Sequence, residues 1–245
     1  MLNLSVIILT CNRRQKLLNC LEKLLSQLGD GDEIVLLDTG STDGTVEYIK
    51  TCDHSKIRLI EWTTRDGSWA EMRNHGIRCS VNPVVAFLDD DCLPDDAWVN
   101  TGKEAISHAH AVGGIVSPWH VTEFPAWWHP AMGWMAGLCE PEHMSDRAGI
   151  TTYPFTANLW VRRSVCIKQP FQELGGDLGG QESGKYLTGR EDAQFWRRLR
   201  TGGYCTRFNK QLRVYHHFDA GLRMRFSYVN KRAQLDGLAW SAREG

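Results

Sequence analysis

The stretch VVAFLDDDC, residues 84–92, joins five apolar side chains to three consecutive aspartates. A short apolar run bounded by polar residues is typical of a buried strand. Strands more often end on glycine, asparagine or a single aspartate, because those residues suit turns. Three carboxylates at one strand end therefore indicate that something positively charged belongs there.

Composition limits the classes of protein that this chain can belong to. Its 245 residues are 42% hydrophobic and 23% charged, which fits one large α/β domain or two small ones with a proper core. The formal net charge is −1 and the sequence pI is about 6.7. No overall positive field attracts polyanions, so we predict no nucleic-acid partner.

The cysteines and the apolar runs predict a compartment. Eight cysteines show neither C-x-x-C pairs nor the paired spacing of a zinc ribbon, so we interpret them as free thiols. No apolar run approaches the roughly 18 residues of a membrane span, and no leader precedes the first predicted strand. We therefore expect a cytoplasmic location, with association at a membrane surface left open.

Strand and helix patterns alternate through the first half of the chain. Leucines recur at helical spacing after the first apolar, β-branched run, and later helices open on capping residues. This alternation predicts an α/β fold with a mostly parallel sheet and helices on both faces. We predict strands over 4–9, 34–37, 57–60 and 84–88, and helices over 17–28, after 41–43 and over 68–79.

Polar residues follow three of these strands. They are Thr10-Cys11-Asn12, Asp38 before a capping turn, and Asp89-Asp90-Asp91. Ligands of such sheets bind at the carboxyl ends of the strands, and Mg²⁺ takes carboxylate, phosphate and water oxygens. The acidic tip, residues 89–91, therefore predicts a cation shared with a diphosphate. A solvated acidic loop that caps the next helix is the alternative.

The stretch GREDAQFWRRLRTGGY, residues 189–204, predicts a helix that starts on two acids. Phe195 and Leu199 share one face, and a glycine pair ends the helix. A carboxylate at a helix N-terminus is stabilised in its ionised form by roughly 0.3 to 1 kcal/mol, which suits a general base. Spacing alone does not separate Glu191 from Asp192, and acids also occur there for stability alone.

Aromatic residues gather between residues 118 and 154, including Trp127, Trp128 and Trp134. Aromatic faces pack against sugars and apolar groups, so this segment is a candidate for acceptor recognition, with a hydrophobic subcore as the alternative. The glycine-rich stretch 174–184 reads equally as a closing flap or a plain connection.

Five blocks, in order, resemble the signature of family 2 glycosyltransferases over roughly residues 3–217. The resemblance implies a GT-A fold, a nucleotide-sugar donor, a divalent metal (Mn²⁺ or Mg²⁺) and inversion at the anomeric carbon. The blocks are Ser5–Arg13, Leu37–Thr45, Arg73-Asn74, Leu88–Asp91 and Gly189–Asp192.

The resemblance assigns the donor side of the site. Thr10 and Asp38 match positions that contact the donor base, and Asn12 lies in the same loop. Asp89 or Asp90 matches the ribose contact. Arg73 matches a donor-side position that meets the base or the diphosphate; a helix-surface arginine is the alternative.

The resemblance also suggests metal, base and acceptor positions. Asp91 matches the metal ligand, and His216 or the adjacent His217 could complete the metal shell. The family pattern places the general base on Asp192, with Glu191 orienting the acceptor. Trp127, Trp128 and Asn158 are the acceptor-side candidates, and Asn158 reads equally as a turn residue.

These expectations combine into one predicted activity. We expect residues 1–217 to form the catalytic domain, with a nucleotide-sugar half (1–117) and an acceptor half (118–217), and residues 218–245 to form a helical extension. That extension could dock on the domain, pair with a second copy or lie on a membrane. No Q-x-x-R-W block follows the acidic pair, which departs from processive members and favours transfer of single sugars.

The substrates are less legible. A UDP-sugar is the favoured donor, because Asp38 can accept an N–H from uracil. The acceptor could be a carbohydrate, a glycolipid or a small molecule. A sugar-nucleotide nucleotidyltransferase and a non-catalytic nucleotide-sugar-binding relative are the alternative functions. The first of these would want a glycine-rich loop for triphosphate, which LTCNRRQ, residues 9–15, lacks.

Overall fold

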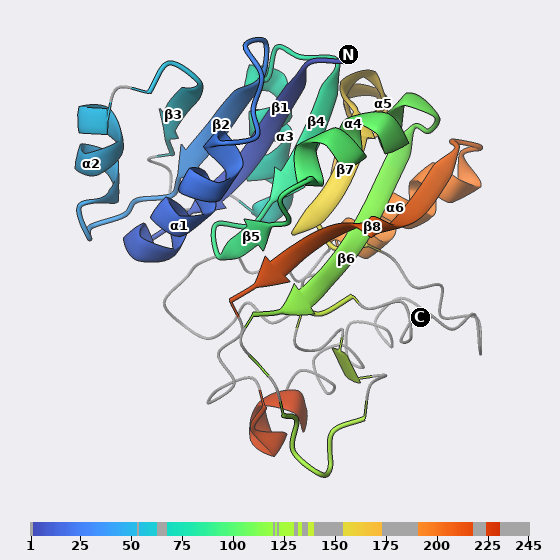
Figure 1. The fold of residues 1–245 in the computed structure, drawn as a ribbon. Coiled ribbons are helices and arrows are strands. Elements are labelled where there is room, and N and C mark those ends of the chain that lie inside the picture. The colour runs from blue at the N-terminus through green and yellow to red at the C-terminus, as the bar shows by residue number, and fades with distance from the viewer. Residues whose placement is uncertain are drawn as a thin grey trace.

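The computed structural model of the chain describes residues 2–52, 54–62, 68–119, 121, 123–129, 132–133, 137–139, 154–172, 191–217 and 224–230. Within them, one mixed sheet carries helices on both faces, which confirms the predicted α/β class (Figure 1). Trp134, the glycine-rich stretch 174–184 and residues 189–190 lie outside the described residues.

The elements follow the predicted alternation and add strands that the sequence patterns did not indicate. The additions are β5, β6 and β7, whereas the last strand, β8, was expected to end at the histidine pair and also begins earlier than its pattern indicated. The strands are β1 (Leu4–Thr10), β2 (Glu33–Asp38), β3 (Ile57–Glu61), β4 (Val84–Leu88), β5 (Cys92–Pro94), β6 (Ala111–Pro118), β7 (Asn158–Arg162) and β8 (Thr206–His216). The helices are α1 (Arg14–Leu25), α2 (Thr45–Cys52), α3 (Trp69–Cys79), α4 (Trp98–Ser107), α5 (Arg163–Lys168) and α6 (Glu191–Thr201).

The sheet has two parts that meet at an antiparallel strand. Its order is β3-β2-β1-β4-β7-β6-β8-β5. The first four strands run parallel to one another. β7 is antiparallel to both of its neighbours, and β6 and β8 are again parallel. The sheet is therefore mixed, with its parallel part at the N-terminal end of the chain.

Alternating side chains divide the core into two layers. Val6 and Ile8 of β1 join the cluster that α1, α2 and α4 cover, with Leu17 of α1 among its members. Ile7 points to the other face, where it joins Ile77 of α3 and the helices α5 and α6. Successive strand residues face opposite sides of a sheet, so both faces of β1 are buried, and the run Val6–Leu9 is apolar without interruption.

The carboxyl ends of β1, β2 and β4 form one rim of the sheet. Thr10 pairs with Asp38 across β1 and β2. After the acidic tip, β5 pairs antiparallel with the end of β8, which places Cys92 opposite His216. The N–H of His217 then donates to the carbonyl of Asp91 over 2.7 Å. The last strand therefore closes the rim beside the acidic tip.

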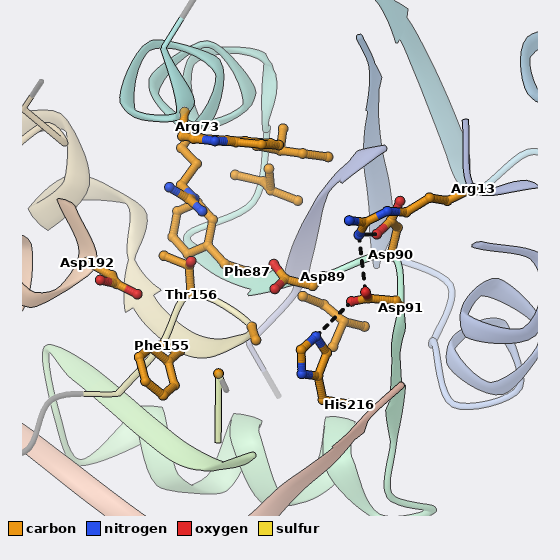
Figure 2. Close-up of a pocket in the computed structure, with 16 residues that line it drawn as sticks. Arg13, Arg73, Phe87, Asp89, Asp90, Asp91, Phe155, Thr156, Asp192 and His216 are labelled. Atoms are coloured by element: carbon orange, nitrogen blue, oxygen red, sulfur yellow. Dashed lines mark hydrogen bonds and ion pairs between the residues drawn. The ribbon is translucent and has the colours of Figure 1, made fainter. Parts of the chain in front are cut away.

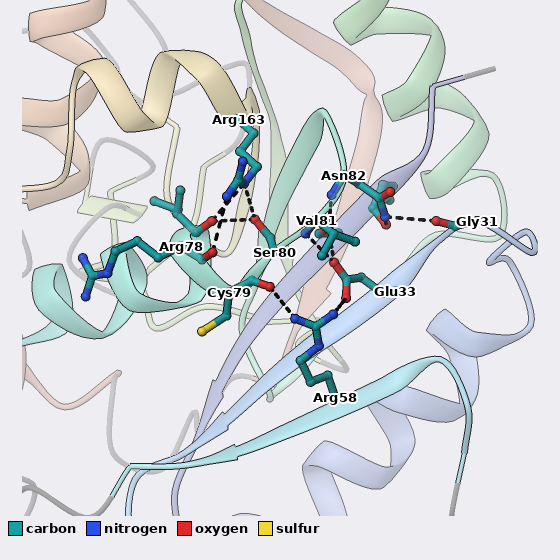
Figure 3. Close-up of polar contacts among 12 residues, drawn as sticks. Gly31, Glu33, Arg58, Arg78, Cys79, Ser80, Val81, Asn82 and Arg163 are labelled. Atoms are coloured by element: carbon teal, nitrogen blue, oxygen red, sulfur yellow. Dashed lines mark hydrogen bonds and ion pairs between the residues drawn. The ribbon is translucent and has the colours of Figure 1, made fainter.

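A polar network lies at the other end of the parallel strands, at their amino ends (Figure 3). Glu33 pairs with Arg58 at 3.1 Å and accepts a hydrogen bond from the N–H of Val81 over 2.8 Å. Asn82 donates to backbone carbonyls at the start of β1 and in the turn before β2, and Arg163 donates to carbonyls in the last turn of α3. Because these groups pair with one another, this end of the strands has a structural role.

The predicted C-terminal extension is described over residues 224–230, of which 226–230 form a short helix. The ring of Phe226 lies 5.8 Å from that of Trp127, and Met224 packs against Leu138. These contacts support docking on the same chain; pairing with a second copy and membrane association stay predictions. Among the described residues, no helix combines the length and the apolar content needed to cross a membrane.

Gly102 lies where α4 packs closely against β7 of the sheet. A Cβ at Gly102 would lie 2.2 Å from the Trp160 ring, which contacts Trp98 at a centroid distance of 4.8 Å. Alanine normally favours a helix over glycine by about 1 kcal/mol. We expect Gly102→Ala to lower Tm instead, because overpacking costs about 1–3 kcal/mol. The exposed Asn100→Ala is the matched control, and a Tm of Gly102→Ala at or above that of the wild type would contradict this packing.

Candidate functional site

A pocket of about 250 Å³ opens at the rim formed by the carboxyl ends of β1 and β4. The start of α6 and the end of β8 complete its walls. Figure 2 shows Asp192 on one side of the pocket and Asp91 with His216 on the other, with Asp89 between them. The structure therefore brings the predicted metal and base residues into a single pocket.

The acidic tip is held by hydrogen bonds from two elements. The hydroxyl of Thr10 donates to Asp90 over 2.8 Å. One guanidinium nitrogen of Arg13, Nη1, lies 2.9 Å from Asp90 and 3.1 Å from Asp91 (Figure 2). Both carboxylates are nearly fully buried, so this arginine supplies the positive charge that the sequence indicates at the strand end.

His216 completes the acidic side of the pocket. Its Nε2 lies 3.2 Å from Oδ1 of Asp91, because the pairing of β5 with β8 sets the two residues side by side. One ligand atom each from Asp89, Asp91, Cys92 and His216 lie within 4.8 Å of one another. Two carboxylates and an imidazole suit Mn²⁺ or Mg²⁺ better than a soft metal.

Burial changes the protonation of these groups. Burial raises the pKa of Asp90 to about 6, with Asp91 adding to the rise while Arg13 opposes it. Burial and the charge of Asp91 also raise the pKa of Asp89. The pKa of the Cys92 thiol is raised far more, by burial and then by the nearby aspartates. In the metal-free chain the Cys92 thiol is therefore protonated at neutral pH.

Asp192 stands at the start of α6, as the sequence predicts. Its carboxylate accepts the N–H of Ala193 over 2.8 Å and also the N–H of Thr156. Burial and the charge of Glu191 raise the pKa of Asp192 to about 7, against the lowering effect of Arg73. A carboxylate with a pKa near neutrality suits proton transfer at physiological pH.

Arg73 links α3 to α6. It forms an ion pair with Glu191 and lies over the ring of Phe171 at 5.7 Å. Only 9% of Arg73 is exposed, so the alternative of a helix-surface arginine is wrong. Burial alone would lower the pKa of Arg73, but the charges of Glu191, Asp89 and Asp192 raise it, and the guanidinium stays charged.

The predicted donor-base residues lie beside the pocket. Asp38 is buried, and its Oδ1 accepts the N–H groups of Gly40 and Ser41 over 3.0 and 2.7 Å. Its Oδ2 is buried without a hydrogen-bond partner among the described residues. Asn12 has a positive φ of 51° and accepts the N–H of Thr42, which holds the loop together.

The two candidate acceptor tryptophans form part of a larger aromatic group. Trp127 and Trp128 lie 6.0 Å apart, and Phe124 stacks on Trp128 at 5.3 Å. Trp128 packs against Leu138, whose neighbour Gly137 lines the pocket. The aromatic group therefore contacts a residue whose sequence neighbour lines the pocket. Its role in acceptor binding stays a prediction.

Two candidate residues have contacts that favour structural roles. Asn158 is fully buried in β7, where it accepts from Trp98 and donates to the carbonyls of Ile115 and Leu212. Glu191 is 4% exposed and pairs with Arg73. Their predicted contacts with an acceptor stay predictions.

Among the pocket residues that were not predicted from the sequence, Arg13 and Thr156 form hydrogen bonds to carboxylates of the pocket. Thr156 was missed because nothing in its neighbours marks it before α6 packs beside it. Arg13 stands inside the first family block, yet no role was given to it. Its place directly after the first rim loop was the available signal, because positive charge was already expected at the rim.

Asp192 generates a test that needs no substrate. Its pKa in the folded chain, about 7, exceeds the ordinary 3.8, so its contribution to stability falls as pH rises between those values. We expect Asp192→Asn to raise Tm at pH 8 and to change it little at pH 4, because asparagine mimics the protonated acid. The exposed Asp30→Asn is the control, and equal Tm shifts at both pH values would contradict the burial of a charge here.

Comparison with known proteins adds a family and a fold. Residues 5–169 match the family model described as glycosyl transferase family 2. The uncharacterized glycosyltransferase YibD of Escherichia coli is 36% identical over 186 residues, which cover 71% of this chain and 52% of that protein. Glycosyltransferase AglE of Haloferax volcanii is 34% identical over 118 residues, or 46% of this chain and 38% of that protein. The chain spans about half or less of the length of these two relatives.

A more distant relative matches along most of the chain. The glucosyl-dolichyl phosphate glucuronosyltransferase of Haloferax volcanii is 23% identical over 231 residues, which cover 88% of this chain and 69% of that protein.

Two solved structures share the fold. Staphylococcus aureus TarS 1–349 in complex with UDP-GlcNAc has a TM-score of 0.65 at 17% identity, covering 97% of this chain and 66% of that one. The mannosyltransferase PcManGT of Pyrobaculum calidifontis, in complex with GDP-Man and Mn²⁺, has a TM-score of 0.58 at 18% identity, covering 87% and 56%. Both are glycosyltransferases of GT-A type, and at these identities the likeness concerns the fold alone.

Proposed function

The chain belongs to glycosyl transferase family 2, and from that premise we propose that it transfers a single sugar from a nucleotide-diphosphate sugar to an acceptor hydroxyl, with inversion. The observation that carries this proposal is the pocket of Figure 2. It has the acidic tip and His216 on one side and Asp192 on the other. Inversion requires the acceptor to attack from the side opposite the leaving diphosphate. The acidic tip would serve the leaving diphosphate, and Asp192 would serve the attacking acceptor.

We place the donor at the acidic side of the pocket. Asp38, at the end of β2, is the candidate for the donor base, with Thr10 at the end of β1 and Asn12 in the adjoining loop. Asp89 or Asp90 is the candidate for the ribose. UDP is favoured as the nucleotide, which agrees with the UDP-GlcNAc held by TarS, whereas PcManGT holds GDP-Man.

A divalent cation fits the residues present. Asp91 and His216 would hold it, with Asp89 within reach, and the complex of PcManGT with Mn²⁺ supports this choice. When bound, such a cation supplies Lewis-acid stabilisation of the diphosphate as it leaves. Arg73 stays charged and lines the same pocket, so it is placed to bind the donor as well.

Asp192 is the proposed general base. Its carboxylate faces the pocket, where it would take the proton from the acceptor hydroxyl as the oxygen forms its bond to the sugar. The N–H groups of Ala193 and Thr156 fix its orientation. Glu191 holds Arg73 in place, and Arg73 in turn keeps the pKa of Asp192 from rising further.

A glycolipid is the acceptor class that we favour among the three predicted ones. The aromatic group around Trp127 and Trp128 offers apolar surface beside the pocket. The dolichyl phosphate in the name of the Haloferax glucuronosyltransferase supports this choice. We propose a cytoplasmic location, because all eight cysteines are free thiols, as predicted, and free thiols are typical of reducing compartments.

Two matched substitutions separate the proposed roles. Asp91→Asn should abolish the rise in Tm that a nucleotide sugar causes with Mn²⁺, because the cation loses a charged ligand. Asp192→Asn should keep that rise and stop transfer, since only the proton acceptor is lost. Thermal shift with UDP-, GDP- and dTDP-sugars, with and without Mn²⁺, measures binding, because a ligand of the native state raises its stability.

The exposed Asp30→Asn controls for the loss of a carboxylate and should behave as the wild type. Release of nucleotide diphosphate in the presence of candidate acceptors measures transfer. Normal transfer by Asp192→Asn would overturn the assignment of the base. A complete lack of metal-dependent shifts in the wild type would overturn the donor site itself.

A further inference from the structure

Arg13 occupies the place where the acidic tip would meet a cation. Its Nη1 lies 2.9 Å from Asp90 and 3.1 Å from Asp91. We propose that Arg13 is a displaceable counter-ion: a divalent cation that binds Asp91 displaces the guanidinium, which then pairs with the diphosphate of the donor. Cation and donor therefore bind cooperatively. This inference rests on the proposed function and adds a donor-site residue to it.

The contact geometry makes the competition direct. A single nitrogen of Arg13 bridges two carboxylates, and Asp91 meets Arg13 through Oδ2 and His216 through Oδ1 (Figure 2). A cation held by Asp91 and His216 would lie close to that nitrogen. Two positive centres that share one carboxylate repel each other, so the guanidinium has to leave or the cation binds weakly.

The two partners differ in their freedom to move. The side chain of Arg13 is 47% exposed, whereas those of Asp90 and Asp91 are each 4% exposed. Arg13 is also the N-cap residue of α1, with no capping hydrogen bond from its side chain. Its guanidinium can therefore rotate away without moving the helix, while the carboxylates stay fixed between β4 and β5.

Charge balance decides when this rotation happens. In the nucleotide-free chain, removal of Arg13 would leave buried carboxylates without its charge, which is costly. A cation alone restores that balance but leaves Arg13 beside a second positive charge. A diphosphate compensates both, because its oxygens bind the cation and accept hydrogen bonds from a guanidinium. The donor therefore strengthens cation binding, and by thermodynamic linkage the cation strengthens donor binding by the same factor.

The test measures Mn²⁺ binding to the full chain by electron paramagnetic resonance of free Mn²⁺, without substrate turnover. In the absence of nucleotide, we expect Arg13→Met to bind Mn²⁺ about tenfold more tightly than the wild type, because the competitor is gone; such a factor is an ordinary size for coupling between two sites. Addition of UDP, or of GDP in parallel, should strengthen Mn²⁺ binding by a smaller factor in the variant. If Arg13 only shaped the site, its removal would weaken Mn²⁺ binding.

Arg14→Met is the matched control. Arg14 is the next residue, carries the same charge and lies over the ring of Tyr48 at 4.7 Å, away from the acidic tip. Arg13→Lys keeps a charge at the tip and should tighten Mn²⁺ binding by a smaller factor, so it serves if Arg13→Met does not fold. Equal or weaker Mn²⁺ binding by the Arg13 variants, or equal tightening in Arg14→Met, would overturn the counter-ion role alone. An absence of Mn²⁺ binding by the wild type, with and without nucleotide, would overturn the proposed metal site as well.

Discussion

Burial of adjacent carboxylates at the end of β4 is the constraint on which the site depends. A buried charge is tolerated only where it is paired and hydrogen-bonded. Thr10 of β1, Arg13 at the start of α1 and His216 of β8 each meet this acidic tip. The first strand–helix connection and the last strand, from opposite ends of the sequence, therefore both have to be in place before the tip is fully paired.

Buried carboxylates are also paired with a positively charged side chain at the start of α6. Glu191 and Asp192 are both buried, and Arg73 pairs with the first and lowers the pKa of the second. Arg73 also feels the charge of Asp89. The guanidinium of Arg73 thus interacts with acidic residues on both sides of the pocket. Asp192 keeps a raised pKa even so, which costs stability at neutral pH and leaves a carboxylate able to take a proton.

Local patterns were enough to predict the parallel part of the sheet and the helices that cover it. β1, β2 and β4 each contain an uninterrupted run of at least four apolar residues, and α6 begins on its two acids as predicted. The partners across the pocket were beyond such patterns. Arg13 and Asp90 are 77 residues apart, and Arg73 and Glu191 are 118 apart. Nothing in the residues between them specifies that they meet.

Asn158 shows the same limit in a single residue. Its sequence neighbours allowed an acceptor contact or a turn, but its amide joins three separate segments inside the sheet. A buried asparagine can be told from an exposed one only when the surrounding donors and acceptors are known. Family resemblance supplied the general position of Asp91 and His216, whereas their contact follows from the pairing of β5 with β8.

That pairing also bears on how the proposed donor and acceptor halves can move. β5 belongs by sequence to the proposed donor half, residues 1–117, yet it pairs with β8 of the acceptor half. β6 likewise lies between β7 and β8. A hinge between the halves would break ladder hydrogen bonds that bury backbone groups, which is expensive. Changes that accompany the reaction are therefore expected in rim side chains, among which Arg13 is 47% exposed.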